Sequence, residues 1–168
     1  LLQQNINEYP GYNEVEVLEA IAGVLEKFYG KIFLLIKLHP YEEPDTFLQQ
    51  PFLQNIHHRI CQDLDALVAI KLADMVIGMR SMLLIEAASL GKQTISYQPV
   101  DPSKDQFYGN ISGMTTACYN ASQLEAKINQ FLDDGNQESF GLTSAMSPTD
   151  NVIDILNRIN KPSISPVS

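Results

Sequence analysis

Short runs of consecutive aliphatic residues recur along this chain, and a helical pattern of apolar residues follows most of them. The clearest run covers residues 32–36 and a shorter one covers residues 75–77, while a further strand is expected at residues 94–97, Thr-Ile-Ser-Tyr. These runs lack the polar alternation of a half-exposed strand, so they predict strands that are covered on both faces. Strands that alternate with helices in this way indicate an α/β fold built on a parallel sheet.

The expected fold is Rossmann-like, with helices on both faces of the sheet and right-handed crossovers between strands. Weaker strand patterns lie at residues 56–60 and 115–119, and residues 41–55 suggest a loop with a short helix. The expected helices start at capping residues or acidic positions and mostly stop at glycine. They run from Asn13, paired with Glu16, to Gly30; from Asp63 or Asp65 to Ala73; from Ser81 to Gly91; from Ser122, paired with Glu125, to Gly135; and over residues 150–160.

A chain of 168 residues suits one ordinary domain with a full core. We place that domain at residues 13–160, between an irregular segment at residues 1–12 and a tail at residues 161–168. The first helix has no convincing strand before it. Either residues 1–12 contain a poor strand, or the chain begins inside a domain and lacks its first strand.

The charge balance argues against nucleic acid as a partner. The net charge is −9, whereas binding to phosphate backbones needs a basic surface. Cys61 and Cys118 have no metal-ligand or disulfide spacing, so we expect a reducing compartment, the cytoplasm, and no metal site. No apolar run approaches the roughly 20 residues that span a bilayer, and no signal peptide opens the chain.

Ligands of open parallel sheets bind at the carboxyl ends of the strands. Residues 78–82 follow one expected strand there, with Gly78, Met79 and Met82 supplying backbone, Ser81 a hydroxyl and Arg80 a guanidinium. Backbone amides at a helix start, together with a forked cation, suit a phosphate. Glu86 lies about 7.5 Å further along the helix, where its carboxylate can accept bonds from a ribose.

Two further candidates follow other strands at the same edge. His39, before Pro40, is a candidate catalytic residue, and Gln98 is a candidate binding residue. Each of these positions also has a simpler interpretation. Ser81 can be only an N-cap, Arg80 a surface charge and Glu86 a solvated helix position, and histidines at strand ends often serve structural hydrogen bonds.

Residues 72–97 resemble the donor-nucleotide segment in the C-terminal domain of GT-B glycosyltransferases and of the related UDP-N-acetylglucosamine 2-epimerases. Residues 86–92, Glu-Ala-Ala-Ser-Leu-Gly-Lys, are most similar to the epimerase form, and residues 37–40, Lys-Leu-His-Pro, resemble the His-Pro element of bacterial GT-B enzymes. The resemblance implies that Ser81 binds the nucleotide diphosphate, Glu86 the ribose, and that His39 lies near the phosphate or sugar. The pattern departs at Met82 and Leu83, where the epimerases have glycines.

The resemblance implies one lobe of a GT-B glycosyltransferase that binds a UDP- or CMP-sugar and needs no cofactor. An amino-terminal Rossmann lobe with the acceptor site would be its partner, so the isolated chain is expected to be inactive. A hydrolysing 2-epimerase and a non-catalytic binding module with the same fold are the alternatives.

Overall fold

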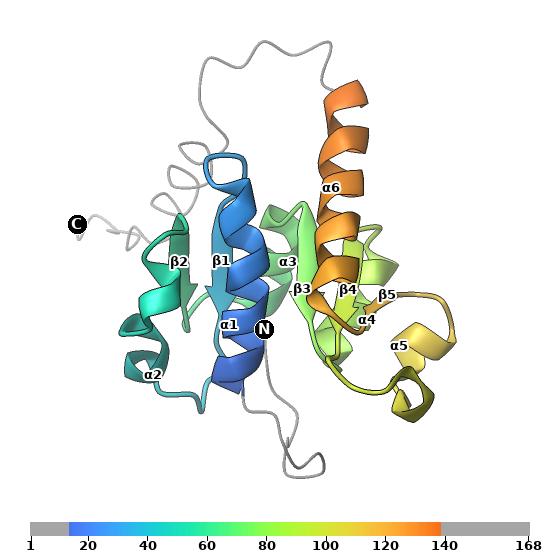
Figure 1. The fold of residues 1–168 in the computed structure, drawn as a ribbon. Coiled ribbons are helices and arrows are strands. Elements are labelled where there is room, and N and C mark those ends of the chain that lie inside the picture. The colour runs from blue at the N-terminus through green and yellow to red at the C-terminus, as the bar shows by residue number, and fades with distance from the viewer. Residues whose placement is uncertain (1–13, 139–168) are drawn as a thin grey trace, which may run out of the picture.

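The computed structural model describes residues 14–138, in which helices alternate with short parallel strands (Figure 1). In chain order the elements are α1 (Glu14–Leu25), η2 (Glu26–Phe28), β1 (Leu34–Lys37), α2 (Pro44–Leu48), η3 (Pro51–Leu53), β2 (His58–Cys61), α3 (Ala66–Leu72), β3 (Met75–Gly78), α4 (Met82–Ser89), β4 (Gln93–Tyr97), η4 (Pro102–Lys104), α5 (Tyr108–Ile111), β5 (Thr116–Cys118) and α6 (Ala121–Glu138). The α/β fold expected from the sequence is therefore confirmed. The helix expected at residues 150–160 and the segments at residues 1–12 and 161–168 lie outside the described residues.

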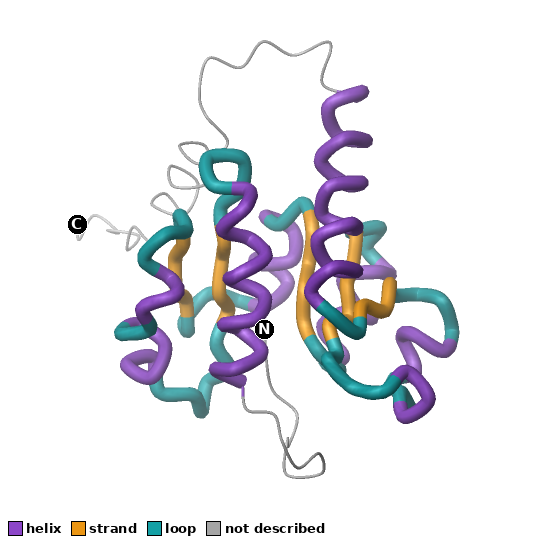
Figure 2. Tube along the Cα trace, in the orientation of Figure 1, coloured by secondary structure: helices purple, strands orange, loops and turns teal. Residues whose placement is uncertain are grey.

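All strand pairs in the described chain are parallel, but they form two sheets. In the first sheet β1 pairs with β2, and Leu34 lies opposite His58. In the second sheet β4 lies between β3 and β5, and Ile95 lies opposite both Ile77 and Thr116. Figure 2 shows the two sheets next to each other in the middle of the molecule. The one continuous sheet that the sequence suggested is thus divided between β1 and β3 among these residues.

Helices cover both faces of the strands, as expected. In Figure 1, α1 and α6 lie in front of the strands, and α3 and α4 lie behind them. The front layer packs into the larger core, which includes Val17, Ile21, Leu124 and Ile128. The rear layer packs into a smaller cluster of buried residues, namely Ile70, Val76, Leu84, Ala87 and Phe107. The sheets are therefore covered on both faces, which explains the consecutive apolar residues of β1 and β3.

Most element boundaries move by one or two residues from the sequence-based expectation. The aliphatic run at residues 32–36 becomes the strand Leu34–Lys37, and the run at residues 56–60 becomes His58–Cys61. Asp65, not Asp63, caps α3, because its carboxylate accepts from the amides of Leu67 at 2.9 Å and Val68 at 3.1 Å. Leu90, the C-cap of α4, is 50% exposed.

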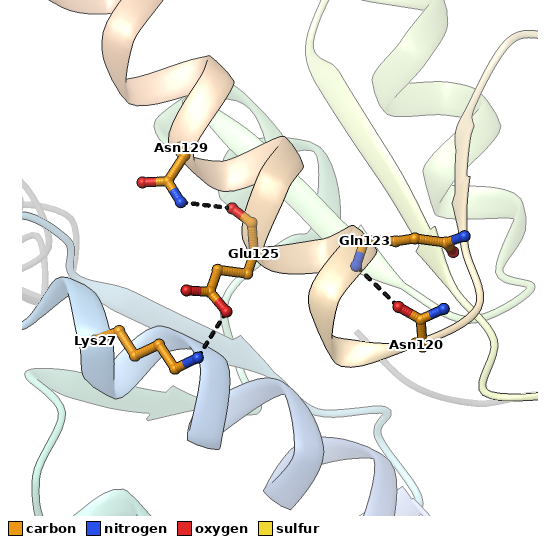
Figure 3. A network of polar contacts seen from close by, with 5 residues as sticks. All are labelled: Lys27, Asn120, Gln123, Glu125 and Asn129. Carbon is orange, nitrogen blue, oxygen red and sulfur yellow. Dashed lines mark hydrogen bonds and ion pairs between the residues drawn. The ribbon is translucent and has the colours of Figure 1, made fainter.

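The expected capping pair of α6, Ser122 and Glu125, is wrong. Asn120 precedes the helix, and its Oδ1 accepts from the amide of Gln123 at 2.9 Å (Figure 3). Glu125 instead pairs with Lys27 of η2 at 2.6 Å, which joins the two front helical segments. The helix also continues past Gly135 to Glu138. Asn120 and Gln123 have the same spacing as the pair we expected, so only the contacts distinguish them.

Within residues 14–138, no helix is both long and apolar enough to cross a lipid bilayer.

Candidate functional site

The β3–α4 turn, Met79, Arg80 and Ser81, connects a buried strand to a helix at the carboxyl edge of the second sheet. Ser81 has extended backbone angles and is the N-cap of α4, with its Oγ accepting from the amide of Leu83 at 3.2 Å. A serine at this position stabilises a helix start by about 1 kcal/mol. Ser81 is therefore an N-cap, and this role leaves a second role in ligand binding open to test.

The N-cap hydrogen bond uses only some of the polar groups of this turn. A helix leaves its first amides without acceptors inside the helix, and the Ser81 hydroxyl satisfies only that of Leu83. No described residue accepts from the amide of Met82. The Ser81 hydroxyl also keeps its own hydrogen, since it acts here only as an acceptor. One amide and one hydroxyl at the positive end of a helix therefore remain for an anionic ligand.

The side chains around this turn divide between core and solvent. Leu84 is 1% exposed and faces the rear core, whereas Met82 is 58% exposed and leaves the helix start open. Glu86 is exposed on α4. At 100° per residue it lies well away from the buried face that Leu84 and Ala87 form, about 7.5 Å along the axis from Ser81. A ligand that contacts both Ser81 and Glu86 must therefore run along the outer side of α4.

The later part of the epimerase-like segment has structural roles. Gly91 has a φ of +77°, a conformation that suits glycine after the last turn of α4. Ser89 donates to the carbonyl of Ile85 at 2.8 Å, and Lys92 Nζ donates to the carbonyl of Lys71 at 3.0 Å. Residues 89–92 therefore end α4 and connect it to the end of α3.

His39 follows β1 at the carboxyl edge of the first sheet, in an exposed loop. Its backbone amide donates to Glu42 Oε2 at 2.5 Å, and its Nδ1 accepts from the amide of Tyr41 at 3.3 Å. Gln62 Nε2 holds the loop in place by donating to the carbonyls of Pro40 at 3.0 Å and Glu42 at 2.8 Å. The loop is therefore well fixed, and Nε2 of His39 is the ring atom that can face a ligand.

Glu42 is a polar residue of this loop that sequence reasoning missed. Its side chain is buried at 8% exposure, and its Oε1 has no hydrogen-bond partner among the described residues. A buried carboxylate oxygen without a donor is costly, so it favours a donor that the described chain does not supply. No spacing or periodicity in residues 39–43 predicts that Glu42 is buried.

Lys37 lies beside the His39 loop at the end of β1. It ends β1 half-buried, and its Nζ donates to the carbonyls of Leu38 at 2.5 Å and Gln62 at 3.0 Å. Lys37 is therefore not a freely solvated edge charge. It holds the ends of β1 and β2 together beside the His39 loop.

Gln98 follows β4 at the same edge, but it lies inside a polar network at 3% exposure. Its Nε2 donates to Ser96 Oγ at 2.8 Å and to Asp105 Oδ1 at 3.2 Å. Ser96 Oγ in turn donates to the carbonyl of Met79 at 2.5 Å. Gln98 is thus connected to the β3–α4 turn through Ser96, which binds the carbonyl of Met79.

Asp105 is the centre of this network. Its carboxylate accepts from the Phe107 amide at 2.9 Å, Asn110 Nδ2 at 2.6 Å and Tyr119 Oη at 2.8 Å, in addition to Gln98. Burial alone would raise the pKa of Asp105, but the bonds from Phe107, Asn110, Tyr119 and Gln98 outweigh it and lower the pKa below its ordinary value of 3.8. Burial, followed by the bond to Asp105, raises the pKa of Tyr119.

We expect Asp105→Asn to lower the unfolding free energy by about 2 kcal/mol at pH 7, because hydrogen bonds to a charged acceptor are lost. A lowered native pKa contributes stability above the ordinary value of 3.8 that is lost as the pH falls through the native pKa. The difference between wild type and variant should therefore shrink below about pH 4. Urea unfolding at pH 7 and pH 3 measures it, and an equal difference at both values would contradict this role.

The structure places the sequence-based candidates at one edge but in two groups. One group lies beside the second sheet and consists of the β3–α4 turn, Glu86 and Gln98. His39 lies beside the first sheet, after β1. A cavity that Ser81 helps to line lies between the two sheets. Within residues 14–138, no three His, Cys, Asp or Glu side chains are grouped as metal ligands.

Family models, curated proteins and solved structures were each compared with this chain, and none of them matches it.

Proposed function

We propose that this chain is the donor-nucleotide-binding half of a GT-B-type glycosyltransferase that acts on a UDP- or CMP-sugar. The observation that carries the proposal is the β3–α4 turn. It offers the Met82 amide and the Ser81 hydroxyl at a helix start, at the carboxyl edge of a parallel sheet. The resemblance of residues 72–97 to the donor segment of that superfamily supports the same assignment.

Each proposed contact follows from the chemistry of a nucleotide-sugar. The diphosphate accepts from the Met82 amide and the Ser81 hydroxyl, with Gly78 and Met79 supplying the backbone approach and Arg80 a nearby positive charge. The ribose hydroxyls donate to Glu86 on the outer side of α4. His39, in the loop after β1, would approach the sugar-bearing phosphate through Nε2. Gln98 contributes indirectly by fixing Met79 through Ser96.

The proposed chemistry is stabilisation of charge on the leaving nucleotide. When the bond between sugar and phosphate breaks, negative charge grows on the phosphate oxygens. Fixed amide, hydroxyl and cationic groups lower the energy of that charge without reorganising. Sugar transfer itself also needs an acceptor site, which in GT-B enzymes is formed with a second Rossmann lobe.

Calorimetric titration of UDP, CMP and GDP into the full chain tests the proposal. We expect saturable binding of UDP or CMP and weaker binding of the other nucleotides. If none of the three binds, the protein is better explained as a binding or assembly module with this fold. The control is inorganic phosphate, which should bind more weakly than the nucleotide because it lacks the ribose contact to Glu86.

Incubation of the full-length protein, including the second lobe that the proposal requires, with UDP-N-acetylglucosamine and no acceptor separates the transferase from the epimerase. Epimerisation needs no second sugar, so a hydrolysing epimerase would use water to release UDP and the free C2 epimer of the sugar under these conditions. We expect the sugar nucleotide to bind and to remain unchanged. Appearance of the epimer would replace the proposal with the epimerase alternative.

A further inference from the structure

The loop after β1 determines which nitrogen of the His39 ring carries a proton. Nδ1 of this ring accepts from the backbone amide of Tyr41 at 3.3 Å. An amide N–H can only donate, so Nδ1 supplies its lone pair, and the single proton of the neutral ring then lies on Nε2. His39 therefore presents an N–H group at Nε2, which is a donor and not an acceptor.

This tautomer decides what His39 can do beside a phosphate. Phosphate oxygens accept hydrogen bonds, and an Nε2–H group donates to them without any change in protonation. An Nε2 atom that already carries a proton cannot remove one from the hydroxyl of a sugar acceptor. The hydrogen bond from Tyr41 therefore favours stabilisation of charge on the phosphate over general base catalysis by His39.

Glu42 fixes the backbone turn on which this arrangement depends. Its Oε2 accepts from the His39 amide at 2.5 Å, and its own amide donates to the His39 carbonyl at 3.0 Å. Residue 42 thus holds both backbone groups of His39. Gln62, which follows β2, donates to the carbonyls of Pro40 and Glu42, so it holds the other side of the same turn.

The burial of Glu42 points to a specific role for this carboxylate. The residue is 8% exposed, and within residues 14–138 its Oε1 has no hydrogen-bond partner. An unpaired buried oxygen lowers stability, and a negative charge near a phosphate site opposes anion binding. The hydrogen bond from the His39 amide to Oε2 is therefore the contact that accounts for a glutamate at this position.

We propose that Glu42 is a positioning residue that holds His39 as an Nε2–H donor to the phosphate next to the sugar. The contact between His39 and the phosphate rests on the proposed function, whereas the tautomer and the bond to Glu42 belong to the protein without ligand. Glu42 touches no ligand itself, because its carboxylate is buried, so it acts through His39.

Two substitutions separate the hydrogen bond of Glu42 from its size and charge. Glu42→Met fills similar space without the carboxylate that accepts from His39, and it also removes the unpaired oxygen, so the variant should fold. Glu42→Gln removes the charge but keeps an accepting oxygen for the His39 amide. Glu43→Met is the matched control, because Glu43 is the exposed neighbouring glutamate and its side chain forms no capping bond to α2.

NMR of the histidine ring nitrogens in the ¹⁵N-labelled full chain tests the positioning without a ligand, at about pH 8.5, where imidazole is ordinarily neutral. We expect a proton on Nε2 of His39 and none on Nδ1. His58 provides the opposite reference, since its Nδ1 lies 3.0 Å from the carbonyl of Ile56 and must donate. Glu42→Met should move the two His39 nitrogen shifts toward each other, as in a ring that exchanges between tautomers, and Glu42→Gln should not.

Either of two NMR results would overturn the inference. The first is a proton on Nδ1 of His39 in the wild type, which is measured without any variant. The second is a pair of His39 nitrogen shifts that Glu42→Met leaves in place.

Calorimetric titration with UDP tests whether Glu42 acts through His39. We expect His39→Ala to weaken binding by about 10- to 100-fold, Glu42→Met by about tenfold, and Glu43→Met not at all. The double variant of Glu42→Met and His39→Ala should bind no more weakly than His39→Ala alone. Losses that multiply in the double variant, or full affinity in Glu42→Met, would overturn the inference. A wild type that does not bind UDP contradicts the proposed function instead, and the ring NMR then decides the role of Glu42.

Discussion

Replacement of Ser81 by aspartate is expected to weaken UDP binding by about 100-fold or more without lowering the melting temperature of the protein. Aspartate caps a helix as well as serine does, and its charge favours the positive end of the helix. The same charge would lie beside the phosphates. Two like charges about 4 Å apart repel by about 1 kcal/mol in water and by about 4 kcal/mol near a protein surface. A 100-fold loss corresponds to about 2.7 kcal/mol, which lies within this range.

Ser81→Asn is the matched control for this substitution. Asparagine is also a good N-cap and has nearly the size of aspartate, but it carries no charge. We expect it to keep most of the affinity for UDP. Titration calorimetry and thermal unfolding of the three proteins separate the roles of Ser81. If Ser81→Asp binds UDP as tightly as the wild type, Ser81 is an N-cap alone and the phosphate site lies elsewhere.

Glu86→Ala is expected to weaken UDP binding by about 10- to 100-fold, because hydrogen bonds to a charged acceptor contribute about 1.5–3 kcal/mol. The effect on stability should stay within about 0.5 kcal/mol, since Glu86 is exposed. The loss should disappear when the ligand is 2′,3′-dideoxy-UDP, which lacks the ribose hydroxyls. Calorimetric titration of both nucleotides into both proteins measures the coupling.

Glu19→Ala provides the control. Glu19 is an exposed glutamate on α1, so its substitution removes the same charge from another part of the surface. It should leave the affinity for UDP unchanged. Equal losses for UDP and the dideoxy nucleotide would show that Glu86 acts through general charge. In that case the ribose contact is wrong even if the phosphate contact is correct.

The sequence predicts the strands and helices well because their signals are local. The strands expected at residues 75–77 and 94–97 become β3 and β4 with shifts of one residue, and Ser81 caps α4 as its position before the helix indicates. The capping pair of α6 was misassigned because two overlapping pairs, Asn120 with Gln123 and Ser122 with Glu125, fit the same rule. Glu125 does not act in capping because its carboxylate pairs with Lys27.

The features that the sequence does not predict depend on contacts between distant residues. Gln98 follows a strand at the ligand edge, but Asp105 draws its amide into a buried network. Glu42 has no pattern around it, and its burial depends on the His39 loop that Gln62 fixes. The division into two sheets depends on which strand edges meet. Aliphatic runs identify buried strands, but they do not say which strands are neighbours.

The central claim is that the turn before α4 binds the phosphates of a nucleotide, and backbone amide chemical shifts measured during a titration with UDP test it most directly. We expect the largest changes at Ser81, Met82 and Leu83, with smaller ones at Glu86 and none at Glu19. Saturating changes that spare these three amides and gather elsewhere in the chain would contradict the account.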